Sequence, residues 1–339
     1  MNHLQALREL GQSLWLDNIT REMLDNGTLK RYIQDDFVTG LTSNPTIFDE
    51  AIGNSDAYDI GIREKSAAGK QGEALFIELA LEDLRRAADL FRPVFEASAG
   101  VDGWVSMELS PLLAADTAGS IKAASRIHEQ AGRANLFVKI PGTPEGVPAI
   151  EESIFNGVPI NVTLLFSTGQ YQAAVEAYLR GIERRVDAGR DPVVASVGSL
   201  FVSRWDKASA EGLPAGLHNK LGIAVAQRTY RAYRELLASP RWKKLAAAGA
   251  HPSGCCGRAP AARTLQPPTP STSKRLRRQA PSTRCQRRPC VRSPITARCA
   301  VRWMRMVAMP RPCCEHWCMP GSTSTHWPHG CSRKARLRS

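Results

Sequence analysis

The sequence predicts an α/β fold, specifically a (β/α)8 barrel of the TIM type with its last two βα units missing or scrambled. Three observations support this prediction. Short apolar runs alternate with helical patterns from residue 13 to residue 238, which favours a parallel sheet covered by helices. The first run continues into LDNIT, without the glycine-rich turn of an open nucleotide-binding sheet. Nearly every run ends in a polar residue, as expected where a barrel gathers its strand ends around one pocket.

Six strands are predicted from apolar runs bounded by turn residues. They cover residues 13–17, 37–44, 103–109, 135–140, 159–166 and 192–201. The intervening helices are predicted from 3.6-residue periodicity and from capping and glycine stop signals. They cover residues 20–33, 71–91, 118–132, 144–157, 171–189 and 217–238. Residues 167–170, Ser-Thr-Gly-Gln, form a capping box before the fifth of these helices.

The composition of the chain changes near residue 250. Residues 1–250 hold 27 Lys and Arg against 31 Asp and Glu, whereas residues 251–339 hold 18 against a single acid, Glu315. The net charges are −4 and +17, and all nine cysteines and 12 of the 22 prolines lie in the second part. We therefore predict a barrel domain over residues 1–250 and an irregular, basic tail rich in Cys, Pro and Arg over residues 251–339.

The composition also bears on the location of the protein and on its partners. The cysteine-free first part fits the reducing cytosol, so we expect a cytoplasmic protein. MNHLQALREL lacks the apolar core of a signal peptide, and no stretch of about 18 uncharged apolar residues predicts a membrane span. The basic residues 273–279 would bind nucleic acid only non-specifically. Residues 313–318, CCEHWC, lack the spacing of a paired metal site, so we expect no metal.

Lys139 is an amine inside the apolar run 137–140. Because side chains alternate along a strand, Lys139 faces the same side as Phe137, and Asn161 faces the same side as Thr163. A buried lysine is more readily neutral; the neutral amine attacks a ketone, and the resulting iminium withdraws electrons from the neighbouring carbon. The alternative is a lysine that extends from a sheet edge into water, but the polar ends of the other strands favour Schiff-base chemistry.

Six motifs follow one another over about residues 10–249: LWLDNI, GLTSNPTIF, VSMELSP, FVKIPGT, INVTLLFS and SLFVSRWD. In these motifs and their order the chain resembles the transaldolases, a family of class I (Schiff-base) aldolase barrels. The resemblance implies transfer of a dihydroxyacetone unit from sedoheptulose 7-phosphate to glyceraldehyde 3-phosphate, giving erythrose 4-phosphate and fructose 6-phosphate, in the pentose phosphate pathway. It implies sugar-phosphate substrates and no cofactor, and it leaves a homodimer open.

The resemblance also implies residue roles. Lys139 corresponds to the Schiff-base lysine, and Asp17 to the group that takes the proton from the C4 hydroxyl. Glu108 and Thr163 correspond to the pair that holds the catalytic water. The positions implied to bind substrate are Thr42, Asn44, Asn161, Ser199, Phe201 and Arg204. In the simpler interpretation, Asp17 caps the following helix and Asn44 begins a turn.

The family has two further strands after residue 249, where this chain shows no periodicity. A strand Leu-Leu-Trp-Ala-Ser-Thr-Gly, written in GC-rich codons and read one base later, gives Cys-Cys-Gly-Arg-Ala-Pro, the sequence of residues 255–260. We therefore hypothesise that residues from about 251 onward are an out-of-frame translation. Two alternatives to a transaldolase stay open: another class I aldolase acting on sugar phosphates, and an inactive truncated barrel or non-specific nucleic-acid binder acting through the tail.

Overall fold

The computed structural model describes residues 3–9, 11–209 and 211–252. The predicted irregular tail, the out-of-frame reading and the CCEHWC segment lie outside the described residues, apart from residues 251 and 252. Within the described part, no helix has the length and apolar character needed to cross a membrane.

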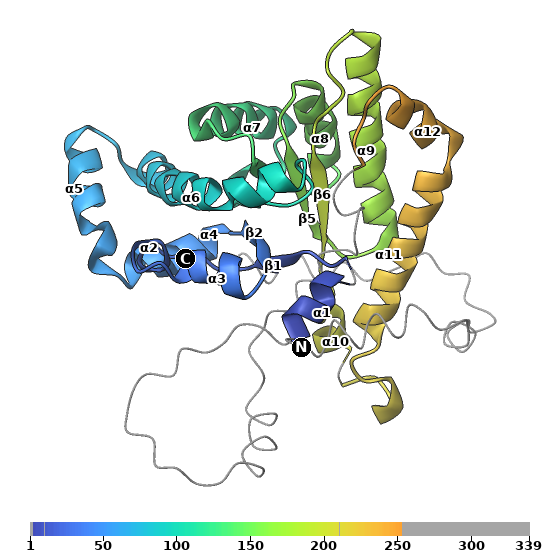
Figure 1. Ribbon diagram of the computed structural model, residues 1–339, viewed down its shortest axis with the longest axis horizontal. Helices are drawn as coiled ribbons and strands as arrows, with labels where there is room; N and C mark the ends of the chain where they lie inside the picture. Colours follow the sequence, from blue (N-terminus) through green and yellow to red (C-terminus); the bar gives the residue numbers. More distant parts are fainter. Residues whose placement is uncertain (1–2, 10, 210, 253–339) are drawn as a thin grey trace. The chain divides into compact units, whose positions relative to one another are not determined.

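The described strands form one parallel sheet whose order follows the sequence from β1 to β6. The strands are β1 (Leu14–Leu16), β2 (Val38–Thr42), β3 (Trp104–Glu108), β4 (Leu136–Pro141), β5 (Ile160–Leu165) and β6 (Ser196–Leu200). An open doubly wound sheet reverses its strand order at a switch point, and this sheet does not. It curls as half of a barrel (Figure 1), which confirms the predicted fold class for the first six units.

Helices that follow the strands pack on the outer face of the sheet, with α7 against β4, α8 against β5 and α9 against β6. The α-helices are α1 (His3–Glu9), α2 (Arg21–Asp25), α3 (Thr28–Asp35), α4 (Pro45–Gly53), α5 (Asp59–Ala67), α6 (Gly72–Ala97), α7 (Thr117–Ala131), α8 (Gly146–Phe155), α9 (Thr168–Asp187), α10 (Ser203–Ala208), α11 (Leu221–Ala238) and α12 (Pro240–Ala247). Short 3-10 turns are η1 (Asp56–Tyr58), η2 (Pro111–Leu113) and η3 (Ala215–Leu217).

The predicted helix over residues 20–33 is wrong as a single element. Gly27 adopts a φ of 73°, a left-handed conformation that glycine tolerates and that ends one helix before the next begins. Two helices, α2 and α3, therefore replace the predicted one. The capping box before α9 is close to the prediction: Gln170 N donates to Ser167 Oγ at 3.1 Å, while Gln170 Oε1 accepts from Phe166 N at 2.8 Å.

An aromatic floor lines the inner face of the sheet and consists of Trp15, Trp104 and Phe137. The Trp104 and Phe137 rings stack with centroids 3.9 Å apart, and the Trp15 and Phe137 centroids are 6.3 Å apart. Gly40 makes room for this packing, because a Cβ there would lie 2.5 Å from the Trp15 ring. The alternation predicted around Lys139 therefore places these rings below the strand ends.

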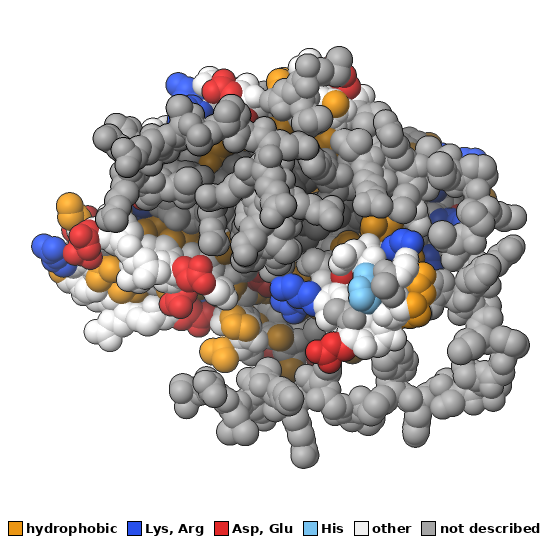
Figure 2. Space-filling model, turned by 90° about the horizontal axis from the view of Figure 1, so that it is seen from below, with side chains coloured by type: hydrophobic (Ala, Val, Ile, Leu, Met, Phe, Trp, Pro, Cys, Tyr) orange, Lys and Arg blue, Asp and Glu red, His pale blue; other side chains and the backbone are white. Residues whose placement is uncertain are grey.

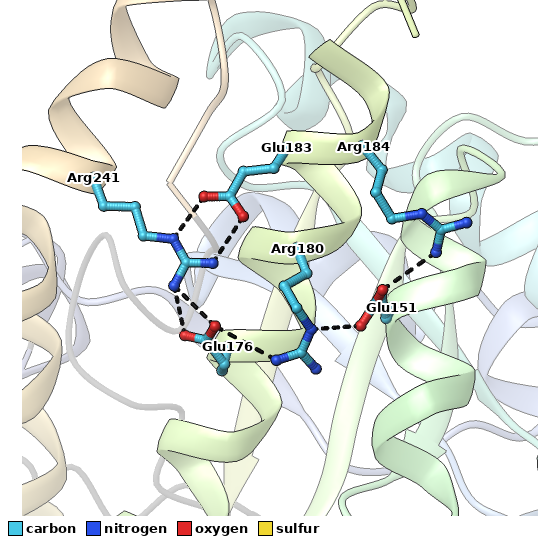
Figure 3. Close-up of polar contacts among 6 residues, drawn as sticks. All are labelled: Glu151, Glu176, Arg180, Glu183, Arg184 and Arg241. Carbon is cyan, nitrogen blue, oxygen red and sulfur yellow. Dashed lines mark hydrogen bonds and ion pairs between the residues drawn. The ribbon is translucent and has the colours of Figure 1, made fainter. Parts of the chain in front are cut away.

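An ion-pair network joins the outer helices on the β5–β6 side of the sheet (Figure 3). Arg241 of α12 donates to Glu183 at 2.6 and 2.8 Å and to Glu176 at 2.7 and 2.9 Å, both glutamates being on α9. Arg180 of α9 donates to Glu151 of α8 at 2.6 Å. On the face shown in Figure 2, acidic and basic side chains of the described residues are interspersed, in keeping with the near-balanced charge of the first part.

Candidate active site

Lys139 projects from β4 into the inner side of the sheet, and its side chain is 1% exposed. Its Nζ donates to Glu108 Oε2 at 2.7 Å and to the carbonyl oxygen of Ser43 at 2.9 Å. In the strand register, Lys139 lies opposite Glu108 on β3 and Asn161 on β5. Since paired residues of parallel strands face the same side, the register itself brings the amine, the carboxylate and the amide together.

Glu108 links the buried amine to solvent. It is the last residue of β3, and its side chain is 19% exposed where that of Lys139 is 1%. A carboxylate at hydrogen-bond distance from an amine can accept its proton and return it later. The pair therefore has the contact that proton transfer at the lysine nitrogen requires.

Asn161 is held at both ends of its amide group. Its Nδ2 donates to Ser106 Oγ at 3.0 Å, and its Oδ1 accepts from Ser199 Oγ at 2.8 Å. Ser106 lies on β3 and Ser199 on β6, so this chain of hydrogen bonds crosses the inner face on either side of Lys139. These two hydrogen bonds restrain the plane of the amide, which has the capacity to accept one further hydrogen bond and to donate one more.

Thr42 and Thr163 lie at strand ends on the same inner face. Thr42 is opposite Ser106, and its buried Oγ1 has no hydrogen-bond partner among the described residues. Thr163 is 1% exposed and opposite Pro141, at an irregularity in the pairing of β5 with β6. The next residue, Leu164, has a φ of 58°. A bulge with such a strained residue redirects neighbouring side chains and occurs often beside functional sites.

The structure bears out neither simpler interpretation, because Asp17 is not the cap of α2 and Asn44 begins a helix, α4, rather than a turn. Asp17 does not cap α2: Thr20 does, with its Oγ1 accepting from Met23 N at 3.2 Å. Asn44 does cap the helix that begins after it, because its Oδ1 accepts from Ile47 N at 2.9 Å. This cap uses only the oxygen of the Asn44 amide, so its Nδ2 donors take no part in holding the helix.

Arg204 lies beside two stacked rings, that of Phe166 just after β5 and that of Phe201 just after β6. Its guanidinium carbon is 5.0 Å from the centroid of Phe201 and 5.9 Å from that of Phe166. The two rings are 5.2 Å apart. Cation–π contact of this kind restrains an exposed guanidinium. The guanidinium of Arg204 and the hydroxyl of Ser199 thus both lie at the carboxyl end of β6, five residues apart in the sequence.

Ser43 and Ser106 are the contributors that sequence reasoning missed. Ser43 acts through its carbonyl oxygen, which no side-chain pattern can indicate. Ser106 could have been found, because it lies two residues before Glu108 and therefore on the same face of β3.

Comparisons with known proteins agree with this geometry. The family model described as Transaldolase/Fructose-6-phosphate aldolase matches residues 14–255. The chain is 44% identical over 260 residues to a transaldolase of Thiobacillus denitrificans, covering 74% of this chain and 72% of that protein. It is 43% identical over 258 residues to a transaldolase of Thermobifida fusca, covering 74% and 70%.

A third relative, Transaldolase 2 of Nostoc punctiforme, is 39% identical over 266 residues, which cover 74% of this chain and 70% of that protein. The motifs at the strand ends, the parallel strand order and these matches lead to one assignment. The chain belongs to the transaldolase/fructose-6-phosphate aldolase family.

Proposed function

We propose that the barrel of this chain is a transaldolase that moves a dihydroxyacetone unit between sugar phosphates through a Schiff base on Lys139. The donor would be sedoheptulose 7-phosphate and the acceptor glyceraldehyde 3-phosphate, in the pentose phosphate pathway of the cytoplasm. One observation carries the proposal: the Nζ of Lys139 is buried at a strand end and is 2.7 Å from a carboxylate oxygen of Glu108.

The first step is imine formation. The lysine nitrogen bonds to the donor's ketone carbon, the carbonyl oxygen leaves as water, and Glu108 exchanges the protons. Thr163, at the bulge of β5, is the second group proposed to hold this water. The same water would later hydrolyse the product imine and regenerate Lys139.

Carbon–carbon cleavage is the second step, and it needs a base at the C4 hydroxyl. Asp17 is proposed to take that proton, so that the C4 oxygen becomes an aldehyde as the C3–C4 bond breaks. The electron pair of that bond moves into the iminium and leaves a three-carbon enamine on Lys139. Addition of this enamine to an acceptor aldehyde reverses the steps and completes the transfer.

The remaining polar groups have the chemistry to hold a sugar phosphate. Thr42, Asn44 and Asn161 present hydroxyl and amide groups suited to sugar hydroxyls. Ser199 and Arg204 are proposed to bind the phosphate, for which a hydroxyl donor and a guanidinium fork are well matched, and Phe201 restrains that guanidinium. The barrel domain is proposed to span residues 1–250. We propose that the protein needs no organic cofactor, because the lysine itself is the electron sink.

A second candidate is an aldolase that cleaves without transfer, since the matching family model is described as both Transaldolase and Fructose-6-phosphate aldolase. Acceptor dependence separates the two activities. A transaldolase passes the dihydroxyacetone unit to an acceptor aldehyde and releases little of it as free dihydroxyacetone, whereas an aldolase releases free dihydroxyacetone without any acceptor.

The proposal is tested by borohydride reduction in the presence of fructose 6-phosphate, with peptide mapping of the product. We expect one reduced adduct, on Lys139, and none in Lys139→Met. The matched control is Lys122→Met, which removes a lysine of α7 and should leave the adduct in place. An adduct mapped to another lysine, or turnover without any adduct, would refute the Schiff base.

A further inference from the structure

A closed polar triangle joins α2, η1 and α6 away from the residues proposed to react, and we call Arg21, Tyr58 and Asp83 the clamp. Tyr58 and Asp83 are fully buried. The Tyr58 hydroxyl donates to Asp83 Oδ2 at 2.7 Å, and Arg21 Nε donates to Asp83 Oδ1 at 2.9 Å. The third side is the backbone N–H of Arg21, which donates to the Tyr58 oxygen at 3.0 Å.

Each member of the clamp is hydrogen-bonded to the other two. Burial raises the pKa of Asp83, and the hydrogen bonds from Tyr58 and Arg21 oppose that rise. Burial also raises the pKa of Tyr58, so its hydroxyl remains a donor. A buried carboxylate that loses one partner keeps an unmet acceptor in the protein interior. The three groups therefore hold one another in a single geometry.

The clamp acts on the segment that carries Asp17. Arg21 is the first residue of α2, four residues after Asp17, and its N–H is one of the helix-end donors that need an outside partner. Between them, Ile19 is 1% exposed and Thr20 caps the helix. The segment 17–20 is thus fixed at its far end by α2 and, through the clamp, by the 26-residue helix α6.

Asp17 needs such support more than Lys139 does. Strand β1 has three residues and, among the described strands, pairs only with β2, with a register shift between Leu14 and Trp15. Strand β4 has six residues and pairs on both sides. A short edge strand has few ladder hydrogen bonds with which to hold the residues beyond its end.

We propose that Arg21, Tyr58 and Asp83 are positioning residues for Asp17, which hold segment 17–20 so that its carboxylate meets the C4 hydroxyl of the bound donor. This inference rests on the proposed function and deepens it. Because Asp17 is assigned to cleavage and not to imine formation, loosening the clamp should slow cleavage and leave imine formation on Lys139 intact.

The test uses the mass of the adduct on the 339-residue chain. After mixing with fructose 6-phosphate, borohydride at set times traps either the uncleaved six-carbon phosphate or the cleaved three-carbon unit on Lys139. We expect Tyr58→Phe and Asp83→Asn to trap the same total adduct within about twofold, while conversion to the three-carbon form slows about tenfold or more, a typical cost of misplacing a catalytic group. In an Asp17→Ala background the same substitutions should cause no further slowing.

Asp89→Asn is the matched control, because it breaks an exposed pair of the same helix, in which Arg133 Nε donates to Asp89 at 2.6 Å. It should leave both rates unchanged. Clamp variants that cleave like the parent chain, or that lose total adduct in parallel with cleavage, would overturn the inference, since the second result marks general damage.

A second readout does not depend on chemistry. Hydrogen exchange should rise about tenfold or more in residues 14–20 of the clamp variants and stay unchanged in residues 136–141. Unchanged exchange in residues 14–20 would overturn the positioning role even if the parent chain formed no adduct. A parent chain that turns over its substrate without an adduct on Lys139, with the exchange difference present, would instead reject the Schiff-base proposal alone.

Discussion

The centre of the sheet and its first strand support their side chains in different ways. On β4, Lys139 is fixed by direct contacts with Glu108 and Ser43 and by paired strands on both sides. On β1, three residues of strand lead to Asp17, and the clamp of α2, η1 and α6 adds restraint from beyond the strand. The central group thus has two paired neighbouring strands and contacts of its own, whereas the edge group has one paired strand and the support of the clamp.

The largest effect is expected at the centre. Lys139→Met should abolish both the borohydride adduct and transfer, a loss on the order of 10³-fold or more, because it removes the amine on which the proposed covalent intermediate forms. A coupled assay for erythrose 4-phosphate measures it. Residual transfer within tenfold of the parent chain would contradict the central role of β4.

The next effect concerns both edges of the sheet. If residues from about 251 are out of frame, β1 and β6 lack the two strands that would join them. We predict that the 339-residue chain aggregates and turns over slowly, because unmet buried polar groups cost about 1–3 kcal/mol each and folding stability totals only about 5–15 kcal/mol. Size-exclusion chromatography and the transfer assay compare it with a frame-restored gene product. Normal activity of the 339-residue chain would refute the frameshift hypothesis.

Substitution of Asp17 tests the role proposed for the group that follows the first strand. Asp17→Ala in the frame-restored protein should slow cleavage by about 10²-fold or more, while donor binding and imine formation change little. Single-turnover quenching separates these steps. An equal loss of adduct and cleavage would mean that Asp17 shapes the pocket rather than moves a proton.

A smaller effect, on the pH dependence of folding stability, is expected from His128 on α7. Burial lowers the pKa of His128, and its Nδ1 has no hydrogen-bond partner among the described residues. Between the lowered folded pKa and the unfolded value near 6.5, the unfolded chain binds more protons, so stability falls as the pH falls below about 6.5. Within that pH range, His128 lowers the free energy of unfolding by at most about 1.4 kcal/mol for each pH unit. Thermal melting at acid and neutral pH should show less acid sensitivity in His128→Phe.

The smallest effect is expected in the ion-pair network outside β6. Arg241 is paired with Glu176 and Glu183, but all three side chains are about a third exposed or more, so water and salt screen them. Arg241→Ala should cost less than about 1 kcal/mol of stability. Denaturant titration at low and high salt checks this, and a larger, salt-independent loss would mean that packing of α12 on α9 matters more than charge.

Prediction from sequence succeeded where one local signal decides the outcome. The six strands are apolar runs that must be buried, and their alternation placed Lys139 and Phe137 on one face. It failed for helix α4, although Asn44 before a proline is a helix start signal, and it made one helix of α2 and α3 across Gly27. The clamp could not be predicted, because Arg21 and Asp83 are 62 residues apart and nothing local relates them.

The aromatic floor has an optical consequence. Trp15 lies two residues before Asp17, and Phe137, on which it stacks, lies two residues before Lys139. Aromatic rings held in fixed, asymmetric contact give near-ultraviolet circular dichroism, and an indole changes its emission when its neighbours move. The protein therefore contains a built-in chromophore that spans the first and fourth strands. A change in the packing of these strands should alter the near-ultraviolet signal of Trp15 without any added label, and comparison with Trp15→Phe separates that signal from those of the other six tryptophans.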